Sequence, residues 1–190
     1  DIPVYQPEFR FDEIGEAGWI DPKKRKELNG AKREFWEPNP EKVPGIERKF
    51  LQMQETYGSW ISKYAKVFDI PEYLLYGLIF TESAGDISAA SGKGAVGLAQ
   101  LMDATAGKAG IKDRNDAEPH IMGGAYYLRY MLNSDRTLGD IRLALYQYNA
   151  GSDRMGDYYG SGSGAAPSVP NEALRYPAQV LFHAATYTTM

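Results

Sequence analysis

Apolar residues recur at spacings of three and four along most of the chain after residue 45, which is the period of helices that bury one face. The first such stretch places Ile46, Phe50, Met53 and Tyr57 on one side of a helix that runs to about residue 68. The same spacing predicts further helices over residues 71–83, 98–106, 119–132, 137–150 and 171–185. No convincing alternation of period two marks a strand, so we predict a mainly α fold with at most a small β-hairpin.

The helix predicted over residues 71–83 differs from the others because it has little polar surface. It starts at Pro71, and Leu74, Leu75, Leu78 and Ile79 lie within it. A helix that is apolar nearly all round is expected to be buried on most sides. We therefore place this helix in the centre of the domain.

Turn and capping residues separate the predicted helices. Residues 85–97 are rich in Gly, Ala and Ser and predict a loop, and residues 160–170 predict a flexible stretch before the last helix. Thr137 and Asp140 form a predicted capping pair at the start of the helix 137–150, and Gly151 ends it.

The first 45 residues have a different composition from the rest of the chain. They hold ten acidic and eight basic side chains together with six prolines, a density of helix breakers that leaves room for only one short helix, over residues 21–35. We therefore divide the chain into a charged, Pro-rich N-terminal extension, 1–45, and a helical domain, 46–190. The extension is expected to pack on the domain or to dock on a partner.

Composition excludes several kinds of chemistry. The 190 residues include no cysteine, and the two histidines, His120 and His183, are 63 positions apart, so thiol chemistry and a metal site are not expected. A net charge of −4 argues against nucleic-acid binding, and no apolar run reaches the ~18 residues of a membrane span. Catalysis, if the protein is an enzyme, would depend on carboxylates, hydroxyls and amides, without a cofactor.

Glu82 is the first candidate for that chemistry. It lies at the end of the apolar helix 71–83, on the same face as Leu75, Leu78 and Ile79. Loss of water around this carboxyl is expected to raise its pKa, and a carboxyl that stays protonated near neutral pH can act as a general acid. The alternative from position alone is a side chain that turns into solvent.

Two other segments are open to more than one interpretation. Residues 92–97 satisfy the pattern GxGxxG, but a helix and a loop precede them where a dinucleotide site needs a strand, so these glycines are better explained by close packing of the backbone. Gln100, on the predicted helix 98–106, and Asn149, after Tyr148, carry amides that either satisfy the core or contact a ligand.

Taken together, these pieces resemble the catalytic domain of the soluble lytic transglycosylases, glycoside hydrolase family 23, which is related to goose-type lysozyme. The resemblance covers the chain from about residue 46 to the last helix and consists of four motifs in family order. The matching positions are Glu82-Ser83; Ser91, Gly94, Ala95, Gly97, Leu98, Gln100, Thr105 and Ala106; Ala144, Tyr148, Asn149, Ala150 and Gly151; and Pro170, Glu172 and Tyr176, with Ile121, Gly124, Tyr127 and Leu128 between the second and third motifs.

Four positions depart from the family pattern. Ala99 stands where Met is usual, and we expect it to reshape the floor of the cleft. Asp103 stands in place of Pro, and His120 in place of Asn. Pro177 follows the tyrosine of the fourth motif, which makes the start of the last helix hard to predict.

The resemblance implies a lysozyme-like fold and cleavage of the β-1,4 bond between N-acetylmuramic acid and N-acetylglucosamine in peptidoglycan. Glu82 would be the single general acid and base, and the product would carry a 1,6-anhydromuramic end. Ser83, Ser91, Gln100, Tyr148, Asn149 and Tyr176 would bind or orient the substrate. The implied location is the cell envelope, the periplasm or the exterior, or alternatively a phage virion.

Two rival functions stay open at this stage. One is a goose-lysozyme-like muramidase, in which Asp86 or Asp103 positions an attacking water. The other is a component that keeps the fold but only binds glycan or takes part in an assembly. A place in a virion or a secretion machine is compatible with activity, and residues 1–45 would then be the docking element.

Overall fold

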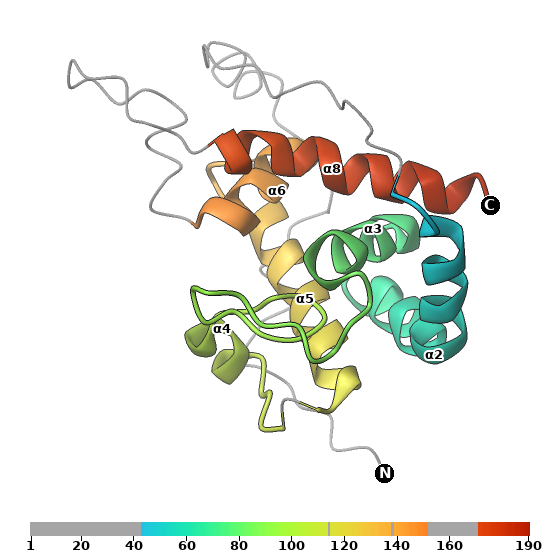
Figure 1. Ribbon diagram of the computed structural model, residues 1–190. Helices are drawn as coiled ribbons and strands as arrows, with labels where there is room; N and C mark the ends of the chain where they lie inside the picture. The colour runs from blue at the N-terminus through green and yellow to red at the C-terminus, as the bar shows by residue number, and fades with distance from the viewer. Residues whose placement is uncertain (1–42, 114, 138, 152–170) are drawn as a thin grey trace.

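The computed structural model describes residues 43–113, 115–137, 139–151 and 171–190, and Figure 1 shows their course. The predicted helix 21–35, nearly all of the extension 1–45 and the predicted flexible stretch 160–170 lie outside the described residues. The described helices are α2 (Ile46–Val67), α3 (Glu72–Ser83), α4 (Asp103–Lys108), α5 (Ala117–Leu132), α6 (Ile141–Ala150) and α8 (Asn171–Thr188).

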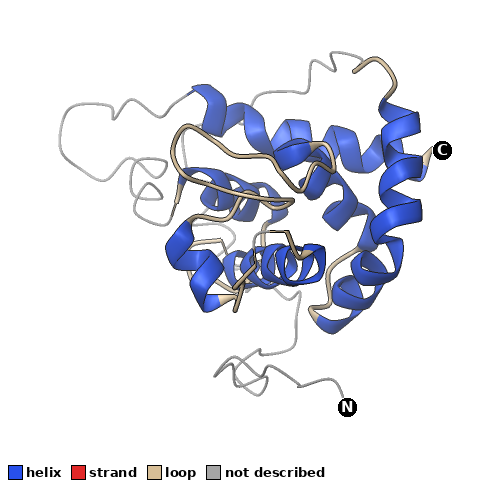
Figure 2. Cartoon of the chain, turned by 60° about the horizontal axis from the view of Figure 1, so that its bottom comes forward, coloured by secondary structure: helices blue, strands red, loops and turns tan. Residues whose placement is uncertain are grey.

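The mainly α prediction is confirmed for the part of the chain that the structure describes. Figure 2 shows helices joined by loops, and the β structure among the described residues amounts to two isolated antiparallel bridges, Ala90 with Val96 and Val96 with Leu101. Both bridges lie in or beside the predicted loop 85–97, where the sequence allowed a small hairpin. No described helix is both long enough and apolar enough to cross a membrane.

Helix α3 is the centre of the fold, as its composition predicts. Seven consecutive residues, from Leu74 to Phe80, are buried, because α2, α5 and α8 all pack against this helix. In Figure 1, α8 runs across α3 on one side, while α2 and α5 flank it on others. The last turn of α3, which carries Glu82, is less deeply buried than its middle.

Helices α3 and α8 approach each other most closely at Gly77. A Cβ atom at this position would lie 2.6 Å from the carbonyl oxygen of Val180 and 2.7 Å from the amide nitrogen of Ala184, both in α8. These distances are far below van der Waals contact, so only glycine allows the two backbones to pack at this spacing. The position of α8, and of every side chain that it carries, depends on this contact.

The predicted helix 98–106 is wrong in its position. Helix α4 begins at Asp103 and extends to Lys108, while residues 97–100 form a turn in which Gly97 has φ +76° and Gln100 has φ +46°. Left-handed residues cannot continue an α-helix. The apolar residues Leu98 and Ala99 are fully buried because the turn packs into the core. Their apolar character therefore resembles that of a helix with one buried face.

The other helix ends differ from the prediction by a few residues, and one cap is wrong. Asp140 caps α6 as expected, by accepting from the amides of Arg142 and Leu143, but Thr137 does not belong to this cap. Its buried hydroxyl lies against the carbonyl oxygens of Met131, Leu132 and Ser134, so it stabilises the end of α5 instead.

Two of the boundary differences occur in helices that contain a proline. Helix α5 begins at Ala117, two residues before Pro119, because proline is tolerated in a first turn whose amide groups have no partner within the helix. Helix α8 continues through Pro177 and ends three residues beyond the predicted end.

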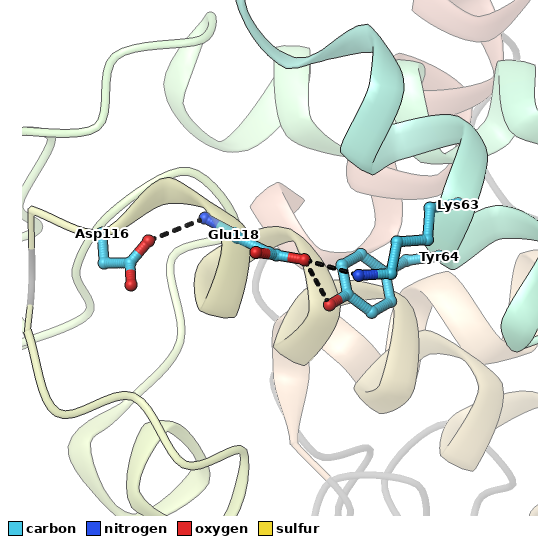
Figure 3. A network of polar contacts seen from close by, with 4 residues as sticks. All are labelled: Lys63, Tyr64, Asp116 and Glu118. Carbon is cyan, nitrogen blue, oxygen red and sulfur yellow. Dashed lines mark hydrogen bonds and ion pairs between the residues drawn. The ribbon is translucent and has the colours of Figure 1, made fainter. Parts of the chain in front are cut away.

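A polar network ties α2 to the start of α5, as Figure 3 shows. The carboxylate of Glu118 accepts from the ammonium group of Lys63 at 2.7 Å and from the hydroxyl of Tyr64 at 2.8 Å. Asp116, the N-cap of α5, accepts from the amide of Glu118. The Lys63 ammonium first, and then the Tyr64 hydroxyl, lower the pKa of the Glu118 carboxyl.

We predict that Gly77→Ala destabilises the protein because the new methyl group must separate α3 from α8. Overpacking of a tight contact costs about 1–3 kcal/mol, and a shift of this size is measurable by urea unfolding. Gly107→Ala in α4 is the matched control, since a Cβ there has nothing within 4 Å. The control is expected to leave stability unchanged or to raise it by up to ~1 kcal/mol through helix propensity. Equal effects of the two variants would contradict the prediction.

We predict that Glu118→Gln costs ~0.5 kcal/mol of stability at pH 7, a small value because the Lys63 and Glu118 side chains are 40% and 34% exposed to screening solvent. The folded-state pKa of Glu118 lies below its ordinary value of 4.5. Its contribution is therefore complete above about 4.5 and is lost as the pH falls through the lower folded value.

Urea titrations of both proteins at pH 7 and at pH 3 measure this difference. The gap between wild type and Glu118→Gln should shrink at the lower pH. Glu55→Gln, an exposed position on α2, controls for the general effect of removing a carboxylate. A gap that is constant with pH, or the same for Glu55→Gln, would show that the network does not contribute.

Candidate active site

Glu82 lies in the last turn of α3, where the chain leaves the core, and its side chain is half-buried. The hydroxyl of Tyr176, from the first half of α8, donates a hydrogen bond to the Oε1 atom of Glu82. Tyr176 is only 4% exposed, so this donor is held in place by the packing of α8 on α3. The structure thus brings together two of the residues that the sequence singled out, 94 positions apart in the chain.

Tyr148 supports this pair from α6. Its ring lies parallel to that of Tyr176, with 6.4 Å between the ring centroids and 7° between the planes. Its hydroxyl donates to the carbonyl oxygen of Ala99 at 2.8 Å. Burial, and then the negative charge of Glu82, raise the pKa of both tyrosines well above the ordinary value, so both hydroxyls stay protonated and remain hydrogen-bond donors.

The turn 97–100 packs directly against α5. A Cβ atom on Gly124 would lie 2.6 Å from the Cβ of Ala99, and one on Gly97 would lie 2.1 Å from the His120 ring. Ala99 is fully buried and fills the space next to Gly124. His120 is likewise fully buried, beneath Gly97.

Three predicted contact residues bind the backbone of the loop between α3 and α4. The amide nitrogen of the Gln100 side chain donates to the carbonyl oxygens of Ala89 and Gly97, at 3.0 and 2.9 Å. The Ser83 hydroxyl donates to the carbonyl oxygen of Leu98 at 2.9 Å. The Ser91 hydroxyl accepts from the amides of Lys93 and Ala95.

The remaining candidates are more exposed. Asn149 is exposed in the last turn of α6. Asp86 is an exposed carboxylate whose pKa is lowered by hydrogen bonds from the hydroxyl and the amide of Ser88. Asp103 lies exposed in the first turn of α4. The side chain of Glu172 and the whole of Pro170 lie outside the described residues.

Sequence reasoning did not assign a role to His120 or to Thr81. His120 is notable in the sequence only as a departure from the family pattern. Its ring fits under residue 97 because glycine has no Cβ there. Thr81 precedes Glu82 and gave no signal in the sequence, although its hydroxyl contacts His183 in α8.

The arrangement is suited to proton transfer by a single carboxyl group. Glu82 has a neutral hydroxyl donor on one side and lies beside a loop whose backbone is held rigidly by Ser83, Ser91 and Gln100. Among the described residues, no group of three His, Cys, Asp or Glu side chains is placed to hold a metal ion. A carboxyl group that can give up and take back a proton is the main chemical resource of this site.

Comparison with known proteins identifies the family. A model described as "Transglycosylase SLT domain" matches residues 59–167, more than half of the chain, and this stretch includes Glu82, Gln100 and Tyr148. The chain belongs to the transglycosylase SLT domain family. The expected resemblance is therefore confirmed.

Relatives with this SLT domain come from phage and bacteria. The transglycosylase of Enterobacteria phage PRD1 is 39% identical over 104 residues, which are 55% of this chain and 37% of that protein. Membrane-bound lytic murein transglycosylase F 2 of Alkalilimnicola ehrlichii is 38% identical over 97 residues, 47% of this chain and 21% of that protein. The chain thus spans well under half the length of these relatives.

Solved structures share the fold. The lytic transglycosylase Slt of Pseudomonas aeruginosa, in an inactive Glu-to-Gln variant, superposes with a TM-score of 0.59 at 24% identity, over 73% of this chain and 25% of that one. The 70 kDa soluble lytic transglycosylase of Escherichia coli gives a TM-score of 0.60 at 22% identity, over 76% and 29% of the two chains. The lysozyme-like SLT fold is therefore present in this chain.

We predict that Gly97→Ala disrupts the turn beside Glu82. Its φ of +76° is strained for any residue with a Cβ, and the new methyl group would meet the buried His120 ring. The expected loss of stability is about 2 kcal/mol or more, from strain and overpacking together, and is measurable by thermal or urea unfolding.

Gly92→Ala is the matched control from the same glycine-rich segment. A Cβ at Gly92 has nothing within 4 Å, and its φ is not in the left-handed region. This variant is expected to stay within about 0.5 kcal/mol of wild type. If the two variants were equally stable, the packing of Gly97 on His120 would not be what shapes the loop.

Proposed function

We propose that this chain is a peptidoglycan lytic transglycosylase with Glu82 as its single catalytic carboxyl group. The observation that carries the proposal is the hydrogen bond from Tyr176 to Glu82, at the end of the buried helix of an SLT domain. Relatives named lytic murein transglycosylases support the substrate, since murein is peptidoglycan.

In the proposed reaction, protonated Glu82 gives its proton to the glycosidic oxygen as the bond to the anomeric carbon of N-acetylmuramic acid breaks. The carboxylate then takes the proton of the C6 hydroxyl of the same sugar, whose oxygen forms a new bond to the anomeric carbon. The cleavage gives two pieces: one begins with an N-acetylglucosamine that has a free 4-hydroxyl, and the other ends in 1,6-anhydromuramic acid. No water is consumed, so a second carboxylate is not needed, unlike in ordinary retaining or inverting glycosidases.

The other predicted residues are assigned on their positions. Tyr176 would orient Glu82, and Tyr148 would hold Tyr176 and the 97–100 turn together. Asn149, exposed at the end of α6, would contact the sugar. Because the polar atoms of Ser83, Ser91 and Gln100 contact the loop backbone, we propose that they bind substrate indirectly, by fixing the carbonyl and amide groups that the glycan meets.

The proposal also covers the division of the chain and its location. We propose that residues 1–45 form a separate docking segment, which their charge and proline density support. The relatives include a phage protein and membrane-bound bacterial proteins. Action on peptidoglycan outside the cytoplasmic membrane, by an exported enzyme or by one carried on a virion, is consistent with both.

We predict that Glu82→Gln abolishes cleavage of purified peptidoglycan while the protein stays folded. A positioned general acid contributes about 100- to 10,000-fold, so turnover should fall by at least that factor. Glu72→Gln is the control, because it makes the same change at an exposed position in the first turn of the same helix. Mass spectrometry of the released muropeptides gives both the rate and the product.

The mass of the product separates the candidate functions. Anhydro ends, lighter than reducing ends by one water, are the expected result. Reducing ends would replace the proposal by a muramidase that uses water, and strand binding without release would replace it by a glycan-binding component. Near-normal turnover in Glu82→Gln would refute the role of Glu82.

A further inference from the structure

Helix α8 reaches α3 at a second polar contact beside the catalytic one. Tyr176 and His183 are seven residues apart in α8, two helical turns, and therefore lie on the same face. Tyr176 bonds to Glu82, and the Nδ1 atom of His183 lies 2.8 Å from the hydroxyl oxygen of Thr81. Thr81 and Glu82 are neighbours in the sequence, so both contacts act on the last turn of α3.

The hydrogen-bonding capacities of these groups assign the proton. The Thr81 hydroxyl donates its single hydrogen to the carbonyl oxygen of Gly77 at 2.7 Å. It can then only accept from His183, so the imidazole carries its hydrogen on Nδ1 and donates it to Thr81. The result is a chain of two bonds, from His183 through Thr81 to the carbonyl of Gly77.

The surroundings of His183 hold the ring in this orientation. The ring of Phe80 packs edge-on against the imidazole with 4.6 Å between centroids, and Phe182 lies 5.7 Å away. Burial lowers the pKa of His183 to about 4, so the imidazole is neutral near pH 7. A neutral ring with a fixed tautomer and little freedom to rotate is a rigid donor.

The last acceptor of these two hydrogen bonds, Gly77, is also the residue at which α3 and α8 approach most closely. Gly77, which accepts from Thr81, is the residue whose missing Cβ allows the backbone of α8 to approach at Val180 and Ala184. The backbone contact sets the distance between the helices. The Thr81–His183 hydrogen bond fixes the position of α8 along α3 and the rotation of α8 about its own axis at that distance.

We propose that Thr81 and His183 are positioning residues for the reaction proposed above, because their hydrogen bond holds the last turn of α3 against α8 at the spacing at which Tyr176 donates to Glu82. Neither side chain touches the substrate in this proposal. Both act through the Tyr176–Glu82 pair, on which the proposed function also rests.

Four substitutions separate this role from general stability. Thr81→Val removes the hydroxyl at nearly constant shape, and Thr81→Ser keeps it. His183→Leu removes the donor. Thr186→Val is the matched control, because the Thr186 hydroxyl makes the same kind of bond, to the carbonyl oxygen of Phe182 at 2.9 Å, but remains within α8.

The first readout does not need activity. In protein labelled with ¹³C at the tyrosine ring, the signal of Tyr176 is identified by its loss in Tyr176→Phe. Thr81→Val and His183→Leu are expected to shift this signal, since Tyr176 no longer donates steadily to Glu82. Thr81→Ser and Thr186→Val are expected to leave it in place.

The second readout is steady-state kinetics on peptidoglycan. Thr81→Val and His183→Leu should lower kcat by about tenfold with KM changed less than about twofold, since they weaken a contact with the catalytic group and leave substrate binding intact. The kcat of the double variant should be no lower than that of the less active single variant, because both substitutions break the same hydrogen bond. Thr81→Ser should recover most of kcat, and Thr186→Val should match wild type.

A Tyr176 signal that does not move in Thr81→Val, or a kcat equal to that of Thr186→Val, overturns the proposal. So do additive losses in the double variant. If Thr81→Val does not fold, Thr81→Ala and His183→Leu test the same bond. A wild type that releases no anhydro product refutes the proposed function, while the Tyr176 signal still decides for or against the positioning role.

Discussion

The contact between α3 and α8 at Gly77 is the constraint on which the rest of the site depends. Because glycine has no Cβ, the two backbones can meet there, and the carbonyl of Val180 and the amide of Ala184 lie where a Cβ would clash. Glu82 belongs to one of these helices and Tyr176 to the other, so their hydrogen bond exists only at this spacing. The geometry of the proposed catalytic pair is therefore decided by packing in the core, five residues from the carboxyl group to which we assign the chemistry.

The sequence was most informative where a local pattern and the tertiary environment agree. The central position of α3 follows from its apolar composition, and a carboxyl at the end of such a helix makes Glu82 a candidate site residue. The sequence was least informative where tertiary packing imitates a local pattern. Leu98 and Ala99 are apolar because the turn presses into the core, and they suggested a helix that Gly97 and Gln100, both with positive φ, exclude. Thr137 resembles a cap but bonds to the end of the preceding helix.

Motif residues that look like ligand contacts in the sequence form much of the scaffold in the structure. Gln100, Ser83 and Ser91 each bond to backbone groups between residues 85 and 98, a stretch that forms only isolated β-bridges. Backbone groups without a regular ladder need other partners, and short polar side chains supply them. A spacing pattern in one sequence cannot distinguish a side chain that touches the substrate from one that shapes the backbone which does. Pairs such as Thr81 and His183 are invisible for a related reason, since 102 positions separate them and only the docking of α8 joins them.

The proposed reaction needs a group that both gives and takes a proton, and Glu82 has a hydrogen-bond donor suited to one of these two states. In the first proposed step, protonated Glu82 gives its proton to the leaving oxygen. The Tyr176 hydroxyl, kept protonated by its own burial and by the nearby carboxylate, favours the ionised form that must then accept the proton of the C6 hydroxyl. In the proposed reaction the tyrosine donor stabilises this second state, so one carboxyl group performs both steps and the nucleophile belongs to the substrate.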